Sequence, residues 1–288
     1  MRQRKELRKL IEEKGIIVAP GVYDCLSAKL AERAGFKMVI ITGAGVVASV
    51  FGYPDMGLVT MTEMLAQARN IVRSVNIPVF ADCDTGYGNA LNVYRTIQEY
   101  EHAGVAGLFL EDQVFPKRCG HFEGKELISK EEMVKKIEAA LDARTDPDLV
   151  IMGRTDARAV YGLDHAVERA NAYAKAGADM VFVEAPQTTE ELQKIAKSVD
   201  VPTMANMVEG GKTPIHSVKE LEEMGFKIAS FSGSAQKTAI KSMQDVFSAL
   251  RTTGRVDAVM DRIASFSERN ELLELQRYYD MDKKYKSS

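Results

Sequence analysis

Short apolar runs recur along the chain, and amphipathic stretches with helical periodicity separate them. Runs of this kind, apolar on both sides and rich in Val, Ile and Phe, are typical of parallel strands whose two faces are covered. We predict eight strands, at residues 16–20, 37–42, 77–82, 105–111, 148–154, 179–184, 201–206 and 226–231. The alternation of these strands with helices predicts an α/β fold.

Glycines mark the ends of several predicted helices. Gly35, Gly104, Gly177 and Gly225 each precede a predicted strand closely, and glycine is the usual residue where a helix ends in a left-handed turn. Eight β-then-α units favour a closed parallel barrel of the TIM type, (β/α)8, over the alternative of an open, doubly wound sheet.

No linker, low-complexity segment or block of like charge divides the chain. We therefore predict a single barrel domain over residues 1–288, with residues 235–288 as a C-terminal helical extension. The stretch 267–285 predicts one further helix, which a barrel does not need in order to close. Its apolar side either covers its own barrel or reaches a neighbouring subunit. That side comprises Leu272, Leu273, Leu275, Tyr278 and Tyr279.

Polar residues stand where nearly every predicted strand ends. Buried charges are costly unless they are paired or bind a metal, so packing of the core does not explain this pattern. The alternative, that these residues cap helices and turns, accounts for only a few of them. Because a parallel barrel builds its active site at the C-terminal ends of its strands, the set predicts an active site. It comprises Thr42-Gly43-Ala44-Gly45, Asp82-Cys83-Asp84, Glu111-Asp112-Gln113, Arg154-Thr155-Asp156, Glu184 and Asn206.

Three of these strand-end residues suggest a metal site. Asp82 and Asp84 are two positions apart, so on a strand both point to one face. Glu111 from the next strand would add a third carboxylate. An all-oxygen set suits Mg²⁺, with Mn²⁺ as the alternative ion, and no histidine cluster supports zinc.

The loop sequence PKRCGH places Cys119 among cationic side chains. Lys117, Arg118 and His121 flank it, and nearby positive charge lowers the pKa of a thiol and makes it reactive. A mobile loop that carries such a thiol over a metal site predicts a lid that delivers an acid or a nucleophile. The alternative is an incidental surface cysteine.

The overall composition excludes several classes of protein. A formal net charge of −3 gives no electrostatic footprint for nucleic acid, and no apolar run approaches the roughly 20 residues that a membrane helix needs. The basic N-terminus lacks the apolar segment of a signal peptide, and its glutamates favour a solvated helix over a transit peptide. Three widely spaced cysteines predict no disulfide framework, with Cys25 and Cys83 packed in the core. We expect a cytoplasmic protein that acts on a small molecule, with no nucleic-acid or membrane partner.

Six motifs occur in order across almost the whole chain: GYPDMGL, DCDTGYG, EDQ, KRCGH, GRTDA and VEAP. In this combination the chain resembles the isocitrate lyase and phosphoenolpyruvate mutase superfamily. Within it, the chain is most similar to the short bacterial lyases, such as those for 2-methylisocitrate and 2,3-dimethylmalate. The resemblance implies a homotetramer, a dimer of dimers, whose last helices are exchanged between paired subunits.

The resemblance also implies roles for individual residues. Asp84 would ligate magnesium directly, and Asp55, Asp82 and Glu111 would act through waters. Cys119 would be the acid on a gating loop. A carboxylate substrate would be held by the turn at Thr42, Gly43 and Ala44 together with Arg154. The remaining implied site residues are His121 and Glu184 as catalytic groups and Gly120 and Asn206 as substrate-binding groups.

The implied reaction cleaves the bond between C2 and C3 of a 2-hydroxy di- or tricarboxylate and releases pyruvate or a similar keto acid. Ile40 stands where lyases for methylisocitrate carry a tyrosine, so the general base is left unassigned. Phe122-Glu123-Gly124-Lys125 follows the cysteine loop, where those enzymes tend to have an arginine. This segment is more similar to the dimethylmalate lyase and oxaloacetate hydrolase side of the family, and it favours a substituted malate over a tricarboxylate. The alternatives are hydrolysis or decarboxylation of oxaloacetate, a phosphonate-forming mutase, and a binding barrel without catalysis.

Overall fold

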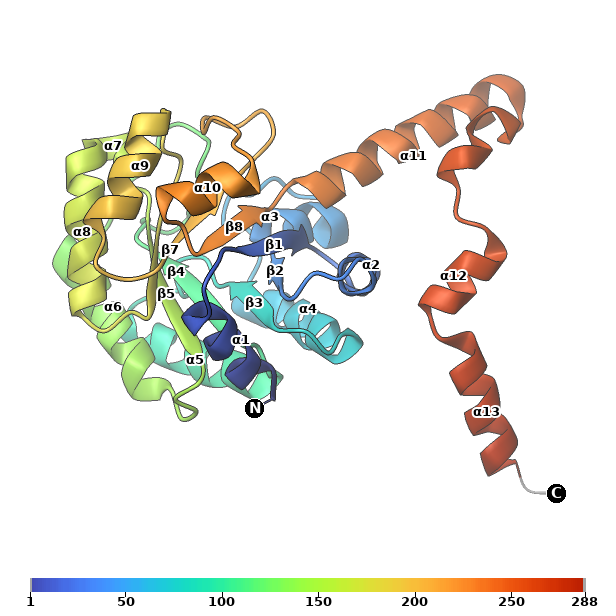
Figure 1. The fold of residues 1–288 in the computed structure, drawn as a ribbon, viewed down its shortest axis with the longest axis horizontal. Helices are drawn as coiled ribbons and strands as arrows, with labels where there is room; N and C mark the ends of the chain where they lie inside the picture. The colour runs from blue at the N-terminus through green and yellow to red at the C-terminus, as the bar shows by residue number, and fades with distance from the viewer. Residues whose placement is uncertain (1, 287–288) are drawn as a thin grey trace. The chain divides into compact units, whose positions relative to one another are not determined.

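Eight parallel strands form the centre of the molecule. The computed structural model describes residues 2–286. The strands pair in chain order and β1 also pairs with β8, so the sheet closes as a barrel (Figure 1). The strands are β1 (Ile17–Val22), β2 (Val39–Ile41), β3 (Val79–Asp82), β4 (Gly107–Glu111), β5 (Val150–Thr155), β6 (Met180–Val183), β7 (Thr203–Asn206) and β8 (Ile228–Phe231). The predicted (β/α)8 barrel is confirmed, with strand boundaries within about two residues of those predicted.

Helices cover the outside of this barrel (Figure 1). Gly104 and Gly225 end two of them in the left-handed conformation, with φ of 91° and 107°. Gly35 and Gly177 also have positive φ, so all four predicted glycine turns are confirmed. The helices are α2 (Cys25–Arg33), α4 (Met61–Ser74), α5 (Ala90–Ala103), α6 (Lys130–Ala143), α8 (Leu163–Lys175), α9 (Thr189–Ser198) and α10 (Val218–Met224), with the short α3 (Gly43–Val46), a π-helix (Val47–Phe51) and α7 (Ala157–Tyr161) after strands β2 and β5.

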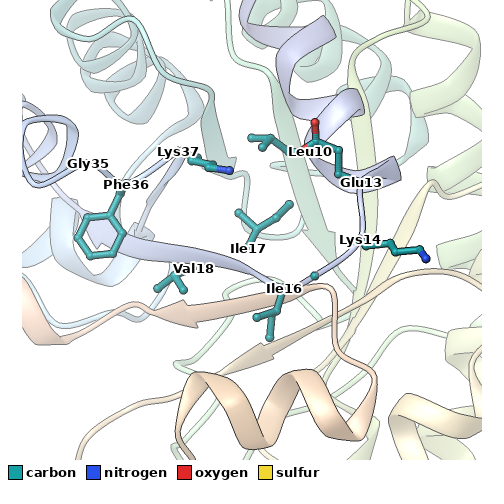
Figure 2. Close-up of a pocket in the computed structure, with 10 residues that line it drawn as sticks. Leu10, Glu13, Lys14, Ile16, Ile17, Val18, Gly35, Phe36 and Lys37 are labelled. Atoms are coloured by element: carbon teal, nitrogen blue, oxygen red, sulfur yellow. The ribbon is translucent and has the colours of Figure 1, made fainter.

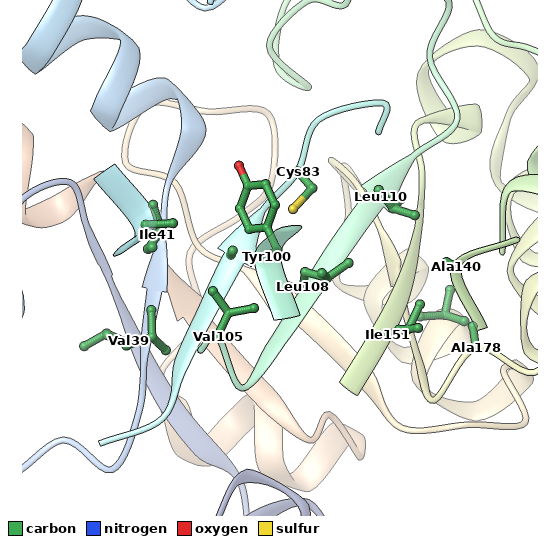
Figure 3. Close-up of a cluster of buried hydrophobic side chains, with 14 of the residues drawn as sticks. Val39, Ile41, Cys83, Tyr100, Val105, Leu108, Leu110, Ala140, Ile151 and Ala178 are labelled. Atoms are coloured by element: carbon green, nitrogen blue, oxygen red, sulfur yellow. The ribbon is translucent and has the colours of Figure 1, made fainter. Parts of the chain in front are cut away.

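Alternate residues of each strand belong to two different cores. One core lies between strands and helices and includes Val39, Ile41, Leu108, Leu110 and Ile151 (Figure 3). The intervening residues fill the barrel interior, as the period of two along a strand requires. These inner residues include Ile40, Phe80, Phe109, Met152, Phe182 and Met204.

The N-terminal helix α1 (Arg2–Glu12) packs against the N-terminal ends of the strands. Leu7 and Leu10 belong to the inner core. Arg4 is buried, and its guanidinium donates to the carbonyl of Val105 at 3.0 Å and to the carboxylate of Asp146 at 2.8 Å. The predicted helix is thus present, but it packs on the barrel through Arg4, Leu7 and Leu10 and is not simply the solvated helix that its glutamates suggested.

The residues from Gln236 onward form a second compact unit. It contains most of α11 (Ser234–Thr253), a 3₁₀ helix (Asp257–Arg262), α12 (Phe266–Leu272) and α13 (Leu275–Tyr285). The prediction of one helix over 267–285 is wrong, because Glu274 takes a left-handed φ of 57° and separates α12 from α13. Large apolar side chains are exposed throughout this unit: Ile240, Met243, Phe247, Leu250, Met260, Phe266, Tyr278, Tyr279, Met281 and Tyr285.

Candidate active site

The polar strand ends lie at one end of the barrel interior. Most follow an inner core residue by two positions, as Asp82 follows Phe80 and Glu111 follows Phe109. The strand period therefore directs these side chains inward, above the apolar filling of the barrel. Asp84 instead lies in the turn after β3, with a φ of 46°. The buried polar residues of the site are Thr42, Asp82, Asp84, Glu111, Arg154 and Glu184.

Asp82 shapes the turns that follow two strands. One carboxylate oxygen accepts from the backbone N–H of Gly43 at 3.1 Å, and the other accepts from the backbone N–H of Asp84 at 3.0 Å. A Cβ on Gly43 would lie 2.7 Å from the carboxylate of Asp82, so this approach requires glycine. Burial, reinforced by the charge of Asp84, raises the pKa of Asp82 to about 6.

Lys117 from the cysteine loop lies among these carboxylates. Its ammonium is 2.5 Å from Asp55 Oδ1 and 2.8 Å from Asp84 Oδ1, and only 3% of its side chain is exposed. Burial alone would lower the pKa of this lysine, but Asp84, Glu111 and Asp55 outweigh it and hold the pKa well above its usual value. Sequence reasoning assigned Lys117 to the thiol, whereas the structure places it on the acids.

Glu111 is fully buried, and neither of its carboxylate oxygens has a hydrogen-bond partner among the described residues. Burial raises its pKa well above the usual range. The nearest opposite charge is Nη1 of Arg154, 3.2 Å from Oε2. A buried carboxylate with open lone pairs is suited to a cation or to its bound waters.

The acids do not form a complete metal cage. Within residues 2–286, no group of three or more His, Cys, Asp and Glu side chains is arranged to hold a metal ion. Mg²⁺ does not need such a cage, because it commonly binds through one or two carboxylates and retains several waters. The hard oxygens of Asp84 and Glu111 fit that mode of binding, and Asp82 lies next to Asp84.

Arg154 is held by acids from three strand ends. Nε and Nη2 donate to the two oxygens of Asp156 at 3.0 and 3.2 Å. Nη2 is also 3.3 Å from Glu184 Oε2. The guanidinium lies 5.4 Å from the ring centroid of Phe182. These contacts fix a planar donor group that can bind a carboxylate in two places.

Asp112 supports this arrangement from behind. Its carboxylate accepts from the hydroxyl of Tyr173 at 2.6 Å, the hydroxyl of Thr155 at 2.7 Å, the backbone N–H of Asp156 at 2.9 Å and the guanidinium of Arg169 at 3.0 Å. Sequence reasoning included Asp112 and Asp156 among the polar strand ends but gave them no role. Their position within the EDQ and GRTDA motifs was the available signal.

The environment of Cys119 differs from the prediction. Its backbone N–H donates to the carbonyl of Asp55 at 3.1 Å, so the loop lies over the acids. Cys119 is half-buried, and this partial burial is enough to raise the pKa of its thiol. The predicted lowering is wrong, because Lys117 contacts carboxylates and Arg118 donates to the carbonyl of Glu123 at 3.1 Å.

Gly120 and His121 bring the loop against Glu184. A Cβ on Gly120 would lie 2.4 Å from Cγ of Glu184 and 2.7 Å from Nη2 of Arg154. His121 Nδ1 accepts from the backbone N–H of Lys212 at 3.1 Å, and Nε2 lies 3.5 Å from Glu184 Oε1. Burial lowers the pKa of His121, so the ring is neutral near pH 7.

The remaining predicted site residues lie at the same end of the barrel. Thr42 caps α3 and its hydroxyl accepts from the N–H of Gly45 at 3.1 Å, while Ala44 in the same turn is half-buried. Asn206 ends β7, and its side-chain oxygen is buried without a hydrogen-bond partner among the described residues. A buried free acceptor of this kind suits a donor on a ligand.

The other two cysteines lie outside the site. Cys83 is fully buried in the outer core, as predicted (Figure 3). Cys25 is only half-buried, so its predicted core position is wrong. It begins α2 directly after the capping residue Asp24, outside the buried positions Ala28 and Ala31.

A separate pocket lies at the opposite end of the barrel (Figure 2). It is bordered by the start of β1 and by the turn before β2, with Leu10 of α1 and Phe36 on its walls. It shares no residue with the strand-end site.

Comparison with known proteins places these features in a family. The family model described as phosphoenolpyruvate phosphomutase matches residues 7–251. The chain belongs to this family. It is 48% identical over 285 residues to 2,3-dimethylmalate lyase of Eubacterium barkeri, covering 99% of each chain.

Two solved structures share the fold. An oxaloacetate acetylhydrolase in complex with 3,3-difluorooxalacetate has a TM-score of 0.93 and 36% identity, with 98% of this chain and 96% of that chain covered. A phosphonopyruvate hydrolase in complex with oxalate and Mg²⁺ has a TM-score of 0.89 and 32% identity, with 99% of each chain covered. The predicted superfamily and the prediction of an oxo-acid lyase are confirmed. Among the described residues, no helix is both long and apolar enough to cross a bilayer.

The raised pKa of Cys119 predicts how its alkylation depends on pH. A free cysteine has a pKa of about 8.5. Because burial disfavours the Cys119 thiolate, the rate constant for its alkylation by iodoacetamide should keep rising above that pH. Mass spectrometry of the separate cysteine peptides would measure this rate for Cys119 alone. If the rate constant levelled off below pH 8, the thiol pKa would be lowered, as the neighbouring cations first suggested, and not raised by burial.

Proposed function

We propose that this protein is a magnesium-dependent lyase that cleaves the C2–C3 bond of a 2-hydroxy dicarboxylate or tricarboxylate, with a substituted malate of the 2,3-dimethylmalate type as the leading substrate. The proposal rests on the position of Cys119 beside the acid cluster. The backbone N–H of Cys119 donates a hydrogen bond to the carbonyl of Asp55, and the ammonium of Lys117 pairs with the carboxylates of both Asp55 and Asp84. Cys119, the proposed proton donor, therefore lies next to the acids that would hold the cation.

The acids would divide the work of holding the metal. Asp84 would ligate Mg²⁺, or Mn²⁺ in its place, and Asp55, Asp82 and Glu111 would bind its waters. The open oxygens of the buried Glu111 support this assignment. Magnesium, when bound, would stabilise negative charge on the substrate oxygen that becomes the keto group.

Groups around the acids would hold the substrate carboxylates. Arg154 presents a fixed guanidinium, and the turn at Thr42, Gly43 and Ala44 lies beside Asp82. Gly120 and Asn206 complete this set, and the free oxygen of Asn206 would accept from the substrate hydroxyl. The high identity to the dimethylmalate lyase favours a substituted malate over a tricarboxylate.

The protein's own groups would then manage the protons. When the C2–C3 bond breaks, its electron pair would stay on C3, and the C2 hydroxyl would pass its proton to solvent as its oxygen becomes the carbonyl of pyruvate. The Cys119 thiol would donate its proton to C3, so a second carboxylate leaves. A raised thiol pKa supports this role, because a donor must stay protonated near pH 7. His121, in its neutral form, and its neighbour Glu184 would together orient the loop beside the reacting atoms.

The C-terminal unit supports a proposal about assembly. Its exposed Ile240, Met243, Phe247 and Leu250 recur at intervals of three and four along α11, which is the spacing of a packing stripe. We propose that α12 and α13 are exchanged between paired subunits of a cytoplasmic homotetramer, a dimer of dimers, because such a surface is otherwise exposed to water.

Hydrolysis of oxaloacetate is the second candidate. The likeness to the oxaloacetate acetylhydrolase complex favours it, because the metal and arginine groups alone could polarise a keto acid at this site. The two candidates differ in their need for a thiol that protonates carbon.

A substrate panel tests the function. 2,3-Dimethylmalate, 2-methylisocitrate, isocitrate and oxaloacetate would each be assayed with Mg²⁺, by coupled detection of keto acid and by chromatography of the second product. We expect the best kcat/KM with 2,3-dimethylmalate, and Cys119→Ser should lower kcat at least about 100-fold with KM little changed, because a general acid acts in the transition state. Cys25→Ser is the matched control. Preference for oxaloacetate, with Cys119→Ser near wild type, would favour the hydrolase.

A truncation tests the assembly. Deleting residues 265–288 removes the exposed Phe266, Tyr278 and Tyr279, so the truncated chain should lose the tetramer in light scattering. Circular dichroism would check that the barrel remains folded. A truncated chain that keeps the tetrameric mass would refute the exchange.

A further inference from the structure

The loop that carries Cys119 begins and ends at adjacent points. Gln113 and Leu127 form an antiparallel bridge. Beside it, the N–H of Val114 donates to the carbonyl of Glu126 at 2.8 Å, and the N–H of Ile128 donates to the carbonyl of Asp112 at 3.0 Å. Backbone hydrogen bonds therefore join the two ends of the loop, and none of them involves the carboxylates of the site.

The side chain of Gln113 holds the residue before the thiol. Its amide oxygen accepts from the N–H of Arg118 at 2.9 Å, and its amide nitrogen donates to the carbonyl of Arg118 at 2.8 Å. Gln113 is 1% exposed. One side chain thus satisfies both backbone groups of Arg118, as a neighbouring strand would, and fixes the backbone from which Cys119 follows.

Lys125 holds the residues after the thiol. Its ammonium donates to the carbonyl of Gly120 at 2.5 Å and to the carbonyl of Phe122 at 2.7 Å. The residue is 7% exposed, and the hydrogen bonds that its ammonium makes to the described residues are these two, both to backbone carbonyls. A buried ammonium whose described partners are carbonyls of one turn strongly favours that turn, since losing either bond leaves charge unsatisfied.

These contacts differ in kind from those between the loop and the barrel. Lys117, Cys119 and His121 contact Asp55, Asp84 and Glu184 across long distances in sequence. The bonds of Gln113 and Lys125 lie entirely within the segment 113–125. A loop that separates from the acids breaks the first kind of contact and can keep the second.

We propose that Gln113 and Lys125 are positioning residues that preserve the shape of residues 118–122, so that the thiol of Cys119 is aimed correctly whenever the loop lies over the acids. The expected loss of kcat rests on the proposed role of Cys119 as proton donor. The expected change in how readily the thiol is alkylated does not depend on that role. Neither side chain is placed on substrate, and Gly120, which Lys125 holds, is one of several groups proposed to bind the substrate. Their loss should therefore affect the chemical step more than substrate binding.

Two substitutions test the proposal in the full-length protein. Gln113→Met removes both hydrogen-bonding groups at similar length, and Lys125→Met does the same for the ammonium, while Lys125→Arg keeps a donor cation. Gln193→Met, at an exposed position on α9, is the matched control. Melting temperatures and the tetramer mass would be recorded for each.

Both Met variants should lose about 10- to 100-fold in kcat with KM within about threefold, because misplacement of the acid by an ångström carries a penalty of this size. Without any ligand, iodoacetamide should alkylate Cys119 at least about fivefold faster in both variants, since the turn no longer encloses the thiol. Lys125→Arg should recover part of each effect.

Two results would overturn the proposal. One is that both Met variants match Gln193→Met in kcat and in Cys119 alkylation within about twofold. The other is that kcat falls only in proportion to the folded fraction, which would make the residues purely structural. If the wild type turned over no compound of the panel while the alkylation rates still rose, the proposed function would fail and the positioning of Cys119 would stand.

Discussion

The carboxylates at the C-terminal ends of the barrel strands carry negative charge away from water, and this charge must be balanced. Asp82, Asp84 and Glu111 are all buried, and burial raises the pKa of Asp82 and of Glu111. Among residues 2–286, Lys117 from the loop and Arg154 from β5 meet this requirement. Because Lys117 belongs to the cysteine loop, the balance of charge also draws Cys119 over the site.

The barrel supplies this geometry through simple rules. A period of two along each strand alternates outer and inner residues, so the last inner position of several strands falls on a polar group. Asp112 then binds the hydroxyl of Thr155 and the N–H of Asp156, and Asp156 orients Arg154. The position of the arginine thus depends on a buried network that extends outward to Arg169 and Tyr173 of α8.

Much of this arrangement could be predicted from the sequence. The alternation of strands and helices predicts the barrel, and the polar strand ends predict that Asp82, Glu111 and Arg154 converge. The side-chain directions inside the loop could not be predicted, because Lys117 and Arg118 adjoin Cys119 in sequence but find partners elsewhere. For the same reason, the predicted lowering of the Cys119 pKa is wrong. The burial of the thiol in the folded loop, which the sequence does not reveal, outweighs the neighbouring positive charge. The break at Glu274 likewise depends on a local left-handed turn at a residue that usually favours helix.

We propose that the buried acids form a cation site centred on Asp84. Isothermal titration calorimetry of Mg²⁺ into the wild-type protein and into Asp84→Asn tests it most directly, with Asp164→Asn, at an exposed carboxylate, as the control. The account predicts one Mg²⁺ per chain in the wild type and in the control, and loss of measurable binding in Asp84→Asn while the melting temperature shows a folded barrel. Equal Mg²⁺ binding by Asp84→Asn and wild type, or no binding by the wild type, would contradict it.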